Sequence, residues 1–346
     1  MDCFYAAVEM LDFPELKGKP MAIGGGERGV LSTSNYEARQ FGVGSAMPTK
    51  MALKLCPHLI LRPHRNQRYV ECSKQIRGIF YKHTDLVEPL SLDEAFIDVT
   101  ENHINCPSAS LIAQMIRKDI FELTGLTASA GISINKFTAK VASDVHKPNG
   151  QLTIEPHEVE AFLEKLPIHK FFGVGKVTGA KMNQLGIING KQLKVHSLDF
   201  LKRNFGKSGV HFYNIVRGIQ FSEVTSDRVR KSIGAERTFK EDSNQHEFLL
   251  DKLNQIGEEL ERRLIKSKTK GKTLTLKIKY SDFTVQTRSK TSSVWLQSKN
   301  ELMEVIELLF FQEPLKDSVR LLGIQMSKLD LDKQEKMEFI QMSFKF

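Results

Sequence analysis

The segment Glu88-Pro-Leu-Ser-Leu-Asp-Glu-Ala-Phe-Ile-Asp-Val99 places two adjacent acids inside an apolar run. The apolar residues are typical of a buried strand, and they are Leu90, Leu92, Phe96, Ile97 and Val99. Neighbouring residues of a strand point to opposite faces, so a straight strand could not aim both Asp93 and Glu94 at one point, whereas a tight hairpin could. Buried carboxylates are costly unless they are paired or bind a metal ion. The segment therefore predicts either a surface hairpin with two solvated acids or half of a metal site suited to phosphate chemistry.

Size and composition set the frame for this segment. The chain has 346 residues, which favours about two to four domains. It contains no run of 18 apolar residues and no basic region followed by an apolar stretch at its start, so we expect neither a membrane span nor a signal peptide. The cysteines lack metal-binding spacing, which is typical of reduced thiols in a cytoplasm. They are Cys3, Cys56, Cys72 and Cys106.

Positive charge is concentrated in one part of the chain. The net charge is +9, and eleven basic residues lie between Arg262 and Lys299, with Asp282 as the only acid. They are Arg262, Arg263, Lys266, Lys268, Lys270, Lys272, Lys277, Lys279, Arg288, Lys290 and Lys299. Such a basic stripe suits a polyphosphate partner. The alternative is a lysine-rich face that is merely solvated.

Hydrophobic periodicity divides the chain into four parts. Residues 1–155 mix short strands with helices, including helical spacing at Tyr69, Cys72, Ile76, Ile79 and Phe80, and again at Leu111, Ile112, Met115, Ile116 and Ile120. Residues 156–221 form short helices broken by glycines, and the polar residues 222–231 resemble a linker. The remainder predicts a split βαβ order. Its elements are strand 232–239, helix 246–266, strands 273–280 and 283–291, helix 299–311 and strand 319–327.

Two of these parts suit nucleic acid. Gly173-Val-Gly175, followed by a helix from Lys176, has the shape of a helix–hairpin–helix, whose backbone N–H groups would hold a phosphate. A plain turn between two helices is the alternative. In strand 273–280, apolar residues alternate with Lys277 and Lys279, which predicts one core face and one basic face for a duplex.

Four further segments make the pattern specific. They are Met1-Asp-Cys-Phe-Tyr-Ala-Ala-Val-Glu9, Thr33-Ser-Asn-Tyr-Glu-Ala-Arg39, Ser91-Leu-Asp-Glu-Ala95 and Lys136-Phe-Thr-Ala-Lys…Lys147-Pro-Asn-Gly150. In this order and spacing the chain resembles the Y-family translesion DNA polymerases, in their bacterial DNA polymerase IV branch, from end to end.

The resemblance implies an α/β multidomain fold shaped as a right hand. Palm and fingers would occupy residues 1–155, with fingers near 4–65 and palm near 1–3 and 66–155. A helical thumb with the helix–hairpin–helix would span 156–221, with Gly173, Gly175 and Lys176 on DNA. After the linker 222–231, a βαββαβ little finger would span 232–336 and present Lys277 and Lys279, and the tail 337–346 would bind the sliding clamp.

The resemblance also implies the chemistry. Members add a deoxynucleotide to a primer 3′-OH on a template, with low fidelity, lesion bypass and no proofreading, using two Mg²⁺ ions. Asp93 matches the bridging metal ligand, and Glu94 matches the acid nearest the 3′-OH. Asp2 and the backbone carbonyl of Met1 lie near the family's remaining metal ligands.

Nucleotide binding follows from the same likeness. Tyr5 matches a steric gate, whose ring leaves no room for a 2′-OH; a Tyr that simply packs in the first helix is the alternative. Cys3 and Phe4 match residues that offer backbone N–H groups to the triphosphate. The implied phosphate-holding side chains are Thr33, Tyr36, Arg39 and Lys147.

The last residues, Gln341-Met-Ser-Phe-Lys-Phe346, resemble the peptide by which bacterial polymerases bind the sliding clamp. Gln341 would form hydrogen bonds, while Phe344 and Phe346 would fill an apolar pocket. Phe344 stands where Leu is usual. We expect a cytoplasmic monomer that binds primer–template DNA, deoxynucleoside triphosphates and the clamp, and no membrane.

One departure from the family pattern opens alternatives. The family's first palm strand ends in hydrophobic-Asp-hydrophobic-Asp, and Asp2 matches the second Asp, whereas the first binds both metals. Either the protein starts about eight residues upstream, which we favour because the other catalytic positions are intact, or it lacks this ligand and Asp2, on the same strand face, partly substitutes. The competing functions are a clamp-tethered, inactive DNA-binding protein and a nucleotidyl cyclase. A cyclase would have no use for the Gly173 turn or the basic stripe.

Overall fold

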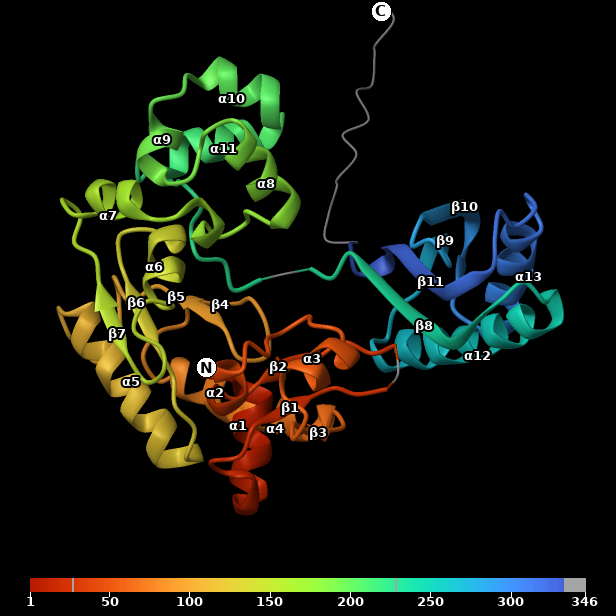
Figure 1. Ribbon diagram of the computed structural model, residues 1–346, viewed down its shortest axis with the longest axis horizontal. Helices are drawn as coiled ribbons and strands as arrows, with labels where there is room; N and C mark the ends of the chain where they lie inside the picture. The colour runs from red at the N-terminus through yellow and green to blue at the C-terminus, as the bar shows by residue number, and fades with distance from the viewer. Residues whose placement is uncertain (27, 228, 333–346) are drawn as a thin grey trace, which may run out of the picture. The chain divides into compact units, whose positions relative to one another are not determined.

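The computed structural model describes residues 1–26, 28–227 and 229–332. The chain forms two compact units, Met1–Asp227 and Arg228–Phe346 (Figure 1). Each unit has its own hydrophobic cores. Within the described ranges, no helix is both long and apolar enough to cross a membrane.

The segment that holds the two acids is a hairpin. Strands β4 (Val87–Pro89) and β5 (Ala95–Ile97) pair antiparallel, with Val87 opposite Ile97 and Pro89 opposite Ala95. The hairpin lies against a core formed with helices α1 (Phe4–Asp12), α4 (Asn66–Phe80) and α5 (Ala109–Thr124). The apolar residues of the hairpin are half-buried and not fully buried, so our expectation of a buried strand was too strong. They are Leu90, Leu92, Phe96, Ile97 and Val99.

The two helical patterns are confirmed with one exception. In α4 the periodic residues, Tyr69 to Phe80, are buried, and in α5 Ile112, Ile116 and Ile120 are buried. Leu111, which we grouped with them, is 54% exposed because it begins the helix beside the core-facing Ile112.

The first unit contains a second pair of strands. Strands β6 (Ala130–Ile132) and β7 (Gln151–Thr153) are parallel, and helix α6 (Lys136–Ala142) packs against β6. Asn135 caps α6 by accepting a hydrogen bond from the N–H of Thr138. Lys140 is therefore held near the C-terminal end of a short, well-anchored helix.

A small three-stranded sheet, in the order β2-β1-β3, supports the remaining N-terminal residues. Its strands are β1 (Met21–Ile23), β2 (Thr33–Ser34) and β3 (Ile60–Arg62), and it carries helices α2 (Tyr36–Gln40) and α3 (Thr49–Leu55). Asn35 ties this region together: its side-chain oxygen accepts from the N–H of Met21 and of Ala38, which starts α2 directly after β2.

Short helices follow, as the glycine-broken pattern predicted. They are α7 (Val159–Lys165), η2 (Ile168–Lys170), α8 (Lys176–Gln184), α9 (Gly190–Lys194), α10 (Leu198–Phe205) and α11 (Lys207–Ile215). They share one core, which also contains Phe137 and Val141 of α6, so these short helices pack directly against α6.

The second unit has the predicted β-α-β-β-α-β order. Its elements are β8 (Ser232–Ser243), α12 (His246–Lys266), β9 (Gly271–Tyr280), β10 (Val285–Leu296), α13 (Lys299–Phe310) and β11 (Val319–Leu329). The sheet order is β10-β9-β11-β8, all antiparallel, and both helices pack on one face (Figure 1). Leu274, Leu276, Ile278 and Tyr280 face that core, as their alternation predicted.

One residue of the basic stripe is in the wrong place for a basic surface. Arg288 is only 4% exposed, and its Nη1 donates to the carbonyl oxygens of Leu309 (2.9 Å) and Phe310 (2.6 Å) at the end of α13. The alternation of β10 turns this side chain inward, where it satisfies helix carbonyls that have no partner within the helix. The prediction that Arg288 belongs to the basic stripe was therefore wrong.

Candidate active site

Asp93 and Glu94 lie on the tight turn that joins β4 to β5. The N–H groups of Leu90 and Ser91 both donate to the carbonyl oxygen of Glu94, at 2.9 and 3.3 Å. The hydroxyl of Ser91 donates to Asp93 Oδ1 (2.8 Å). The side chains of Asp93 and Glu94 are 26% and 36% exposed, so each carboxylate is partly desolvated and still reachable. The turn breaks the strand alternation, as predicted, and presents both acids at one end of the hairpin.

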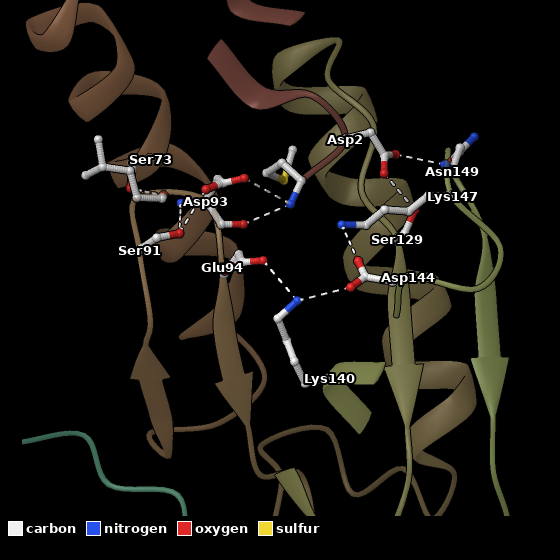
Figure 2. Close-up of polar contacts among 12 residues, drawn as sticks. Asp2, Ser73, Ser91, Asp93, Glu94, Ser129, Lys140, Asp144, Lys147 and Asn149 are labelled. Carbon is white, nitrogen blue, oxygen red and sulfur yellow. Dashed lines mark hydrogen bonds and ion pairs between the residues drawn. The ribbon is translucent and has the colours of Figure 1, made fainter. Parts of the chain in front are cut away.

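Each of these acids has a nitrogen atom close by. The nitrogen of Met1 donates to the carbonyl oxygen of Asp93 (2.9 Å) and lies 3.6 Å from Asp93 Oδ2. Lys140 reaches from α6 between Glu94 Oε1 (3.2 Å) and Asp144 Oδ2 (3.5 Å), as Figure 2 shows. Burial alone would lower the pKa of Lys140, but the charges of Asp144 and Glu94 outweigh burial and raise it. The carboxylates of Glu94 and Asp144 therefore hold one cation, the Lys140 ammonium, at this end of the hairpin.

Asp144 connects this cluster to Lys147. Lys147 Nζ lies 2.8 Å from Asp144 Oδ1. Burial opposes ionisation of Asp144, yet the hydrogen bond from Lys147 and the charge of Lys140 together lower its pKa. Glu94, Lys140, Asp144 and Lys147 thus form a continuous chain of alternating charge. Neither Lys140 nor Asp144 was among the predicted site residues, although both lie in or next to the Lys136–Gly150 motif, with the i, i+4 spacing that brings helix residues together.

Asp2 is held on the other side of the cluster. Its Oδ1 accepts from the hydroxyl of Ser129 (2.7 Å), its Oδ2 accepts from the N–H of Asn149 (2.8 Å), and the residue is 2% exposed. These bonds tie Asp2 to the turn that carries Lys147 and not to the hairpin. Across the described ranges, no group of three or more His, Cys, Asp or Glu side chains is arranged to hold a metal ion.

The start of α1 carries the residues expected to contact the sugar and triphosphate. Cys3 caps the helix with φ 37°, and burial raises the pKa of its thiol to about 11. Phe4 is buried, whereas Tyr5 is half-buried and its ring stacks on that of Tyr69, with 4.4 Å between centroids. Burial, followed by the charge of Asp93, raises the pKa of the Tyr5 hydroxyl.

Three of the four predicted phosphate-holding residues lie at the join of β2 and α2. Thr33 is in β2, and the guanidinium of Arg39 lies 4.6 Å from the ring centroid of Tyr36 while its Nε donates to the carbonyl oxygen of Ser34 (3.2 Å). Burial raises the pKa of Tyr36 to about 12, and the charge of Asp2 adds to the rise. The buried Tyr36 hydroxyl has no hydrogen-bond partner among the described residues. Such a donor is unusual and suits an oxygen-rich ligand.

The glycine-rich turn of the helical part also has a defined shape. Gly173 has φ +90°, which a residue with a side chain rarely adopts, and Gly175 stands at the N-cap of α8 without a side-chain cap. Gly173, Gly175 and Lys176 are all exposed. The first N–H groups of α8 are therefore open to an anion.

Lys277 and Lys279 of the second unit lie on the sheet face opposite the helices, as predicted. Lys277 Nζ contacts Glu236 Oε2 (2.9 Å), and Lys279 lies 4.6 Å from the ring centroid of Phe283. Gln341, Phe344 and Phe346 of the tail lie outside the described residues.

Comparison with known proteins gives the lineage. Residues 1–144 match the impB/mucB/samB family, residues 156–187 its helix–hairpin–helix motif and residues 230–341 its C-terminal domain. DNA polymerase IV 2 of Agrobacterium fabrum is 49% identical over 96% of this chain and 94% of its own length. DNA polymerase IV of Leptospira interrogans is 46% identical over 99% of this chain and 97% of its own.

The chain belongs to the Y-family of DNA polymerases. A Y-family polymerase chimera, Dbh-Dpo4(243-245)-Dbh, superposes with a TM-score of 0.84 at 28% identity and covers 95% of this chain and 97% of its own. The right-hand fold, the helix–hairpin–helix and the DNA-directed DNA polymerase activity expected from the sequence are thereby confirmed. This Y-family polymerase is similar over nearly its whole length to proteins named DNA polymerase IV.

Proposed function

We propose that Asp93 and Glu94 are the acids of a two-metal polymerase site, with Glu94 closest to the primer 3′-OH. The observation that carries the proposal is the turn itself: two adjacent, partly exposed carboxylates lie together at one end of the hairpin, and Lys140 Nζ lies 3.2 Å from Glu94 Oε1. Their oxygen atoms are the hard donors that Mg²⁺ prefers. Bound there, Mg²⁺ would activate the 3′-oxygen and neutralise charge on the leaving pyrophosphate.

The surrounding residues suit the incoming nucleotide. Lys147 and Arg39 supply positive charge, and the unpaired Tyr36 hydroxyl supplies a buried donor, so together they would bind and orient the triphosphate. Thr33 and the backbone N–H groups of Cys3 and Phe4 complete this set. The stacked ring of Tyr5 would lie under the sugar and exclude a 2′-OH by a steric clash.

DNA would be held mainly through its backbone. The open N–H groups at Gly173, Gly175 and Lys176 would bind a phosphate, and Lys277 and Lys279 would follow the duplex on the other unit. Contacts of this kind do not read sequence, which fits a low-fidelity, lesion-bypassing monomer without proofreading. The tail residues Gln341, Phe344 and Phe346 would bind the sliding clamp, and the protein would act in the cytoplasm.

Primer extension by Glu94→Gln tests the chemistry. This change keeps the size of the side chain and removes its charge, so we expect a fall in kcat of about 10³-fold, a typical cost of losing an essential electrostatic group. Affinity for primer–template should stay within about threefold of wild type, a change of less than about 0.7 kcal/mol. Asp98→Asn is the matched control, because Asp98 follows the same hairpin and accepts from the N–H of Thr100. Equal extension rates for Glu94→Gln and Asp98→Asn would overturn the assignment.

The second candidate keeps this chain in the same polymerase family but supposes that it has lost the family's activity and acts as a clamp-tethered DNA-binding protein. It is favoured by the position of Asp2, whose carboxylate is committed to Ser129 and Asn149 and not to the Asp93–Glu94 turn. The two candidates differ in one result. If this chain binds primer–template and the clamp but adds no nucleotide at saturating Mg²⁺, the second function holds.

A further inference from the structure

Glu9 is a carboxylate that the chemistry described above does not use, and it is 0% exposed. It lies four residues after Tyr5 on α1, so both side chains share one face of the helix. Its Oε1 accepts from the hydroxyl of Tyr69 (2.8 Å) and from Nε of Arg65 (2.7 Å). A fully buried acid at one turn's distance from the sugar-facing residue needs an explanation.

The bonds to Glu9 are costly to break. A buried carboxylate that loses its partners leaves an uncompensated charge in the interior. Arg65 is itself fixed, because its Nη2 also donates to Asp12 Oδ2 (2.7 Å), one further turn along α1. The acceptor that Glu9 offers to Tyr69 is therefore locked in place by α1 and by the start of α4.

Tyr69 transmits this position to Tyr5. Tyr69 is fully buried, and its ring stacks on that of Tyr5 at 4.4 Å between centroids and 18° between planes. Phe4 packs against both rings, at 5.6 Å from Tyr5 and 6.5 Å from Tyr69. Burial raises the pKa of Tyr69 to about 12, so its hydroxyl remains a neutral donor to Glu9 at physiological pH. The hydrogen bond from the Tyr69 hydroxyl to Glu9 fixes the orientation and depth of the Tyr69 ring. The Tyr69 ring in turn stacks against the Tyr5 ring and supports it.

We propose that Glu9 is a positioning residue for sugar selection: through Tyr69 it sets the height of the Tyr5 ring and thereby the enzyme's discrimination against ribonucleotides. This inference rests on the proposed steric role of Tyr5. A steric gate discriminates only if its ring cannot retreat when a 2′-OH arrives, and a buried charge-assisted hydrogen bond behind the ring supplies that resistance.

The experiment compares single-nucleotide insertion of dCTP and CTP by the full-length chain. Tyr69→Phe keeps the ring and the stack and removes only the bond to Glu9. We expect kcat/KM for CTP to rise about tenfold, equivalent to about 1.4 kcal/mol of lost resistance, and kcat/KM for dCTP to change less than about threefold. Tyr280→Phe is the matched control, because it removes an equally buried hydroxyl, bonded to Gln286 (2.6 Å), in the other unit.

Glu9→Gln tests the acid itself. The amide retains an oxygen that accepts from Tyr69 but loses the charge, so we expect an intermediate rise for CTP, and no further rise when Glu9→Gln is added to Tyr69→Phe. Tyr5→Ala separates this inference from the steric role on which it rests. If Tyr5→Ala abolishes discrimination while Tyr69→Phe matches Tyr280→Phe, the positioning role is wrong. If Tyr5→Ala leaves discrimination unchanged, the steric role itself fails.

Discussion

Lys140 contacts Glu94 across two elements that lie far apart in the sequence, with 3.2 Å between Nζ and Oε1. The same ammonium contacts Asp144, so the proposed catalytic acid and the acid that holds Lys147 share one partner. Lys140 therefore links the proposed metal-binding side of the site to the proposed phosphate-binding side.

We expect Asp144→Asn to lower stability in a pH-dependent way. The pKa of Asp144 is lowered in the folded protein, so its contribution is present above its unfolded pKa and is lost as the pH falls through the folded value. The raised pKa of Lys140 gives a contribution that is present below its unfolded pKa and lost only as the pH rises through the folded value. The variant should therefore be less stable than wild type at pH 7, and the difference should shrink as the pH falls below about 4, the usual pKa of Asp in an unfolded chain.

The expected difference at pH 7 is small. Asp144 is half-exposed, so we expect about 0.5 kcal/mol after solvent screening, read from thermal unfolding between pH 3 and pH 8. Glu122→Gln, in the exposed pair with Lys118 on α5, is the control and should show almost no difference. A constant difference at all pH values would contradict this account of the pair.

Lys147→Ala should weaken nucleotide binding without regard to the base. The ammonium is only 25% exposed and is held in place by Asp144, so it is preorganised for a phosphate oxygen. Loss of one charge-assisted contact should lower kcat/KM for all four deoxynucleotides about tenfold or more. Lys118→Ala, an exposed lysine on α5, is the matched control. A loss confined to one base would show that Lys147 acts through the template pair and not through the triphosphate.

Gly173→Ala should reduce DNA affinity independently of sequence. Gly173 has φ +90° and open space where the Cβ of an alanine would lie, so the change strains the backbone without a clash and tilts the open N–H groups of α8. Loss of one phosphate contact should lower affinity about equally for all sequences, with little change in the slope of log affinity against log salt, because a backbone N–H carries no net charge. Gly186→Ala has similar strain, φ +77° and equally open space, at the other end of α8, and should leave DNA affinity unchanged.

Deletion of Gln341–Phe346 should leave distributive synthesis intact and abolish stimulation by the sliding clamp. The two aromatic residues would act as the anchors of the peptide, and such anchors carry most of the binding energy of an interface. Lys345→Ala, which changes the tail between the two anchors, should retain stimulation. Primer extension with and without a loaded clamp measures both, and stimulation that survives the deletion would refute the assignment.

The sequence predicts those parts of this protein that depend on local pattern. The alternation of Leu274, Leu276 and Ile278 with polar residues fixes one face of β9, and the structure follows it. The turn at Asp93–Glu94 was likewise predictable, because two adjacent acids cannot share one face of a strand. The positions of the phosphate-holding residues came from the family motifs and not from physical pattern.

The local sequence pattern does not show which residues become partners through the tertiary fold. Glu9 looks like an ordinary helix residue until Arg65 and Tyr69 are placed against it, some 60 residues later in the chain. Lys140 lies inside a motif that was recognised, yet only the fold brings Glu94 to it. Such residues gain their role from tertiary contact, and a single sequence gives no sign of it.

Arg288 carries a positive charge, which predicted a place on the basic surface, but its side chain is buried in the second unit. Arg288→Met should destabilise the second unit by about 2–3 kcal/mol, because hydrogen bonds from a charged donor to Leu309 and Phe310 are lost inside the core. Lys290→Met, two residues along the same strand and exposed, should leave stability nearly unchanged. Urea unfolding of both variants measures stability, and a DNA-binding titration of Arg288→Met measures affinity. If Arg288→Met instead weakens DNA binding at unchanged stability, the guanidinium faces the duplex after all.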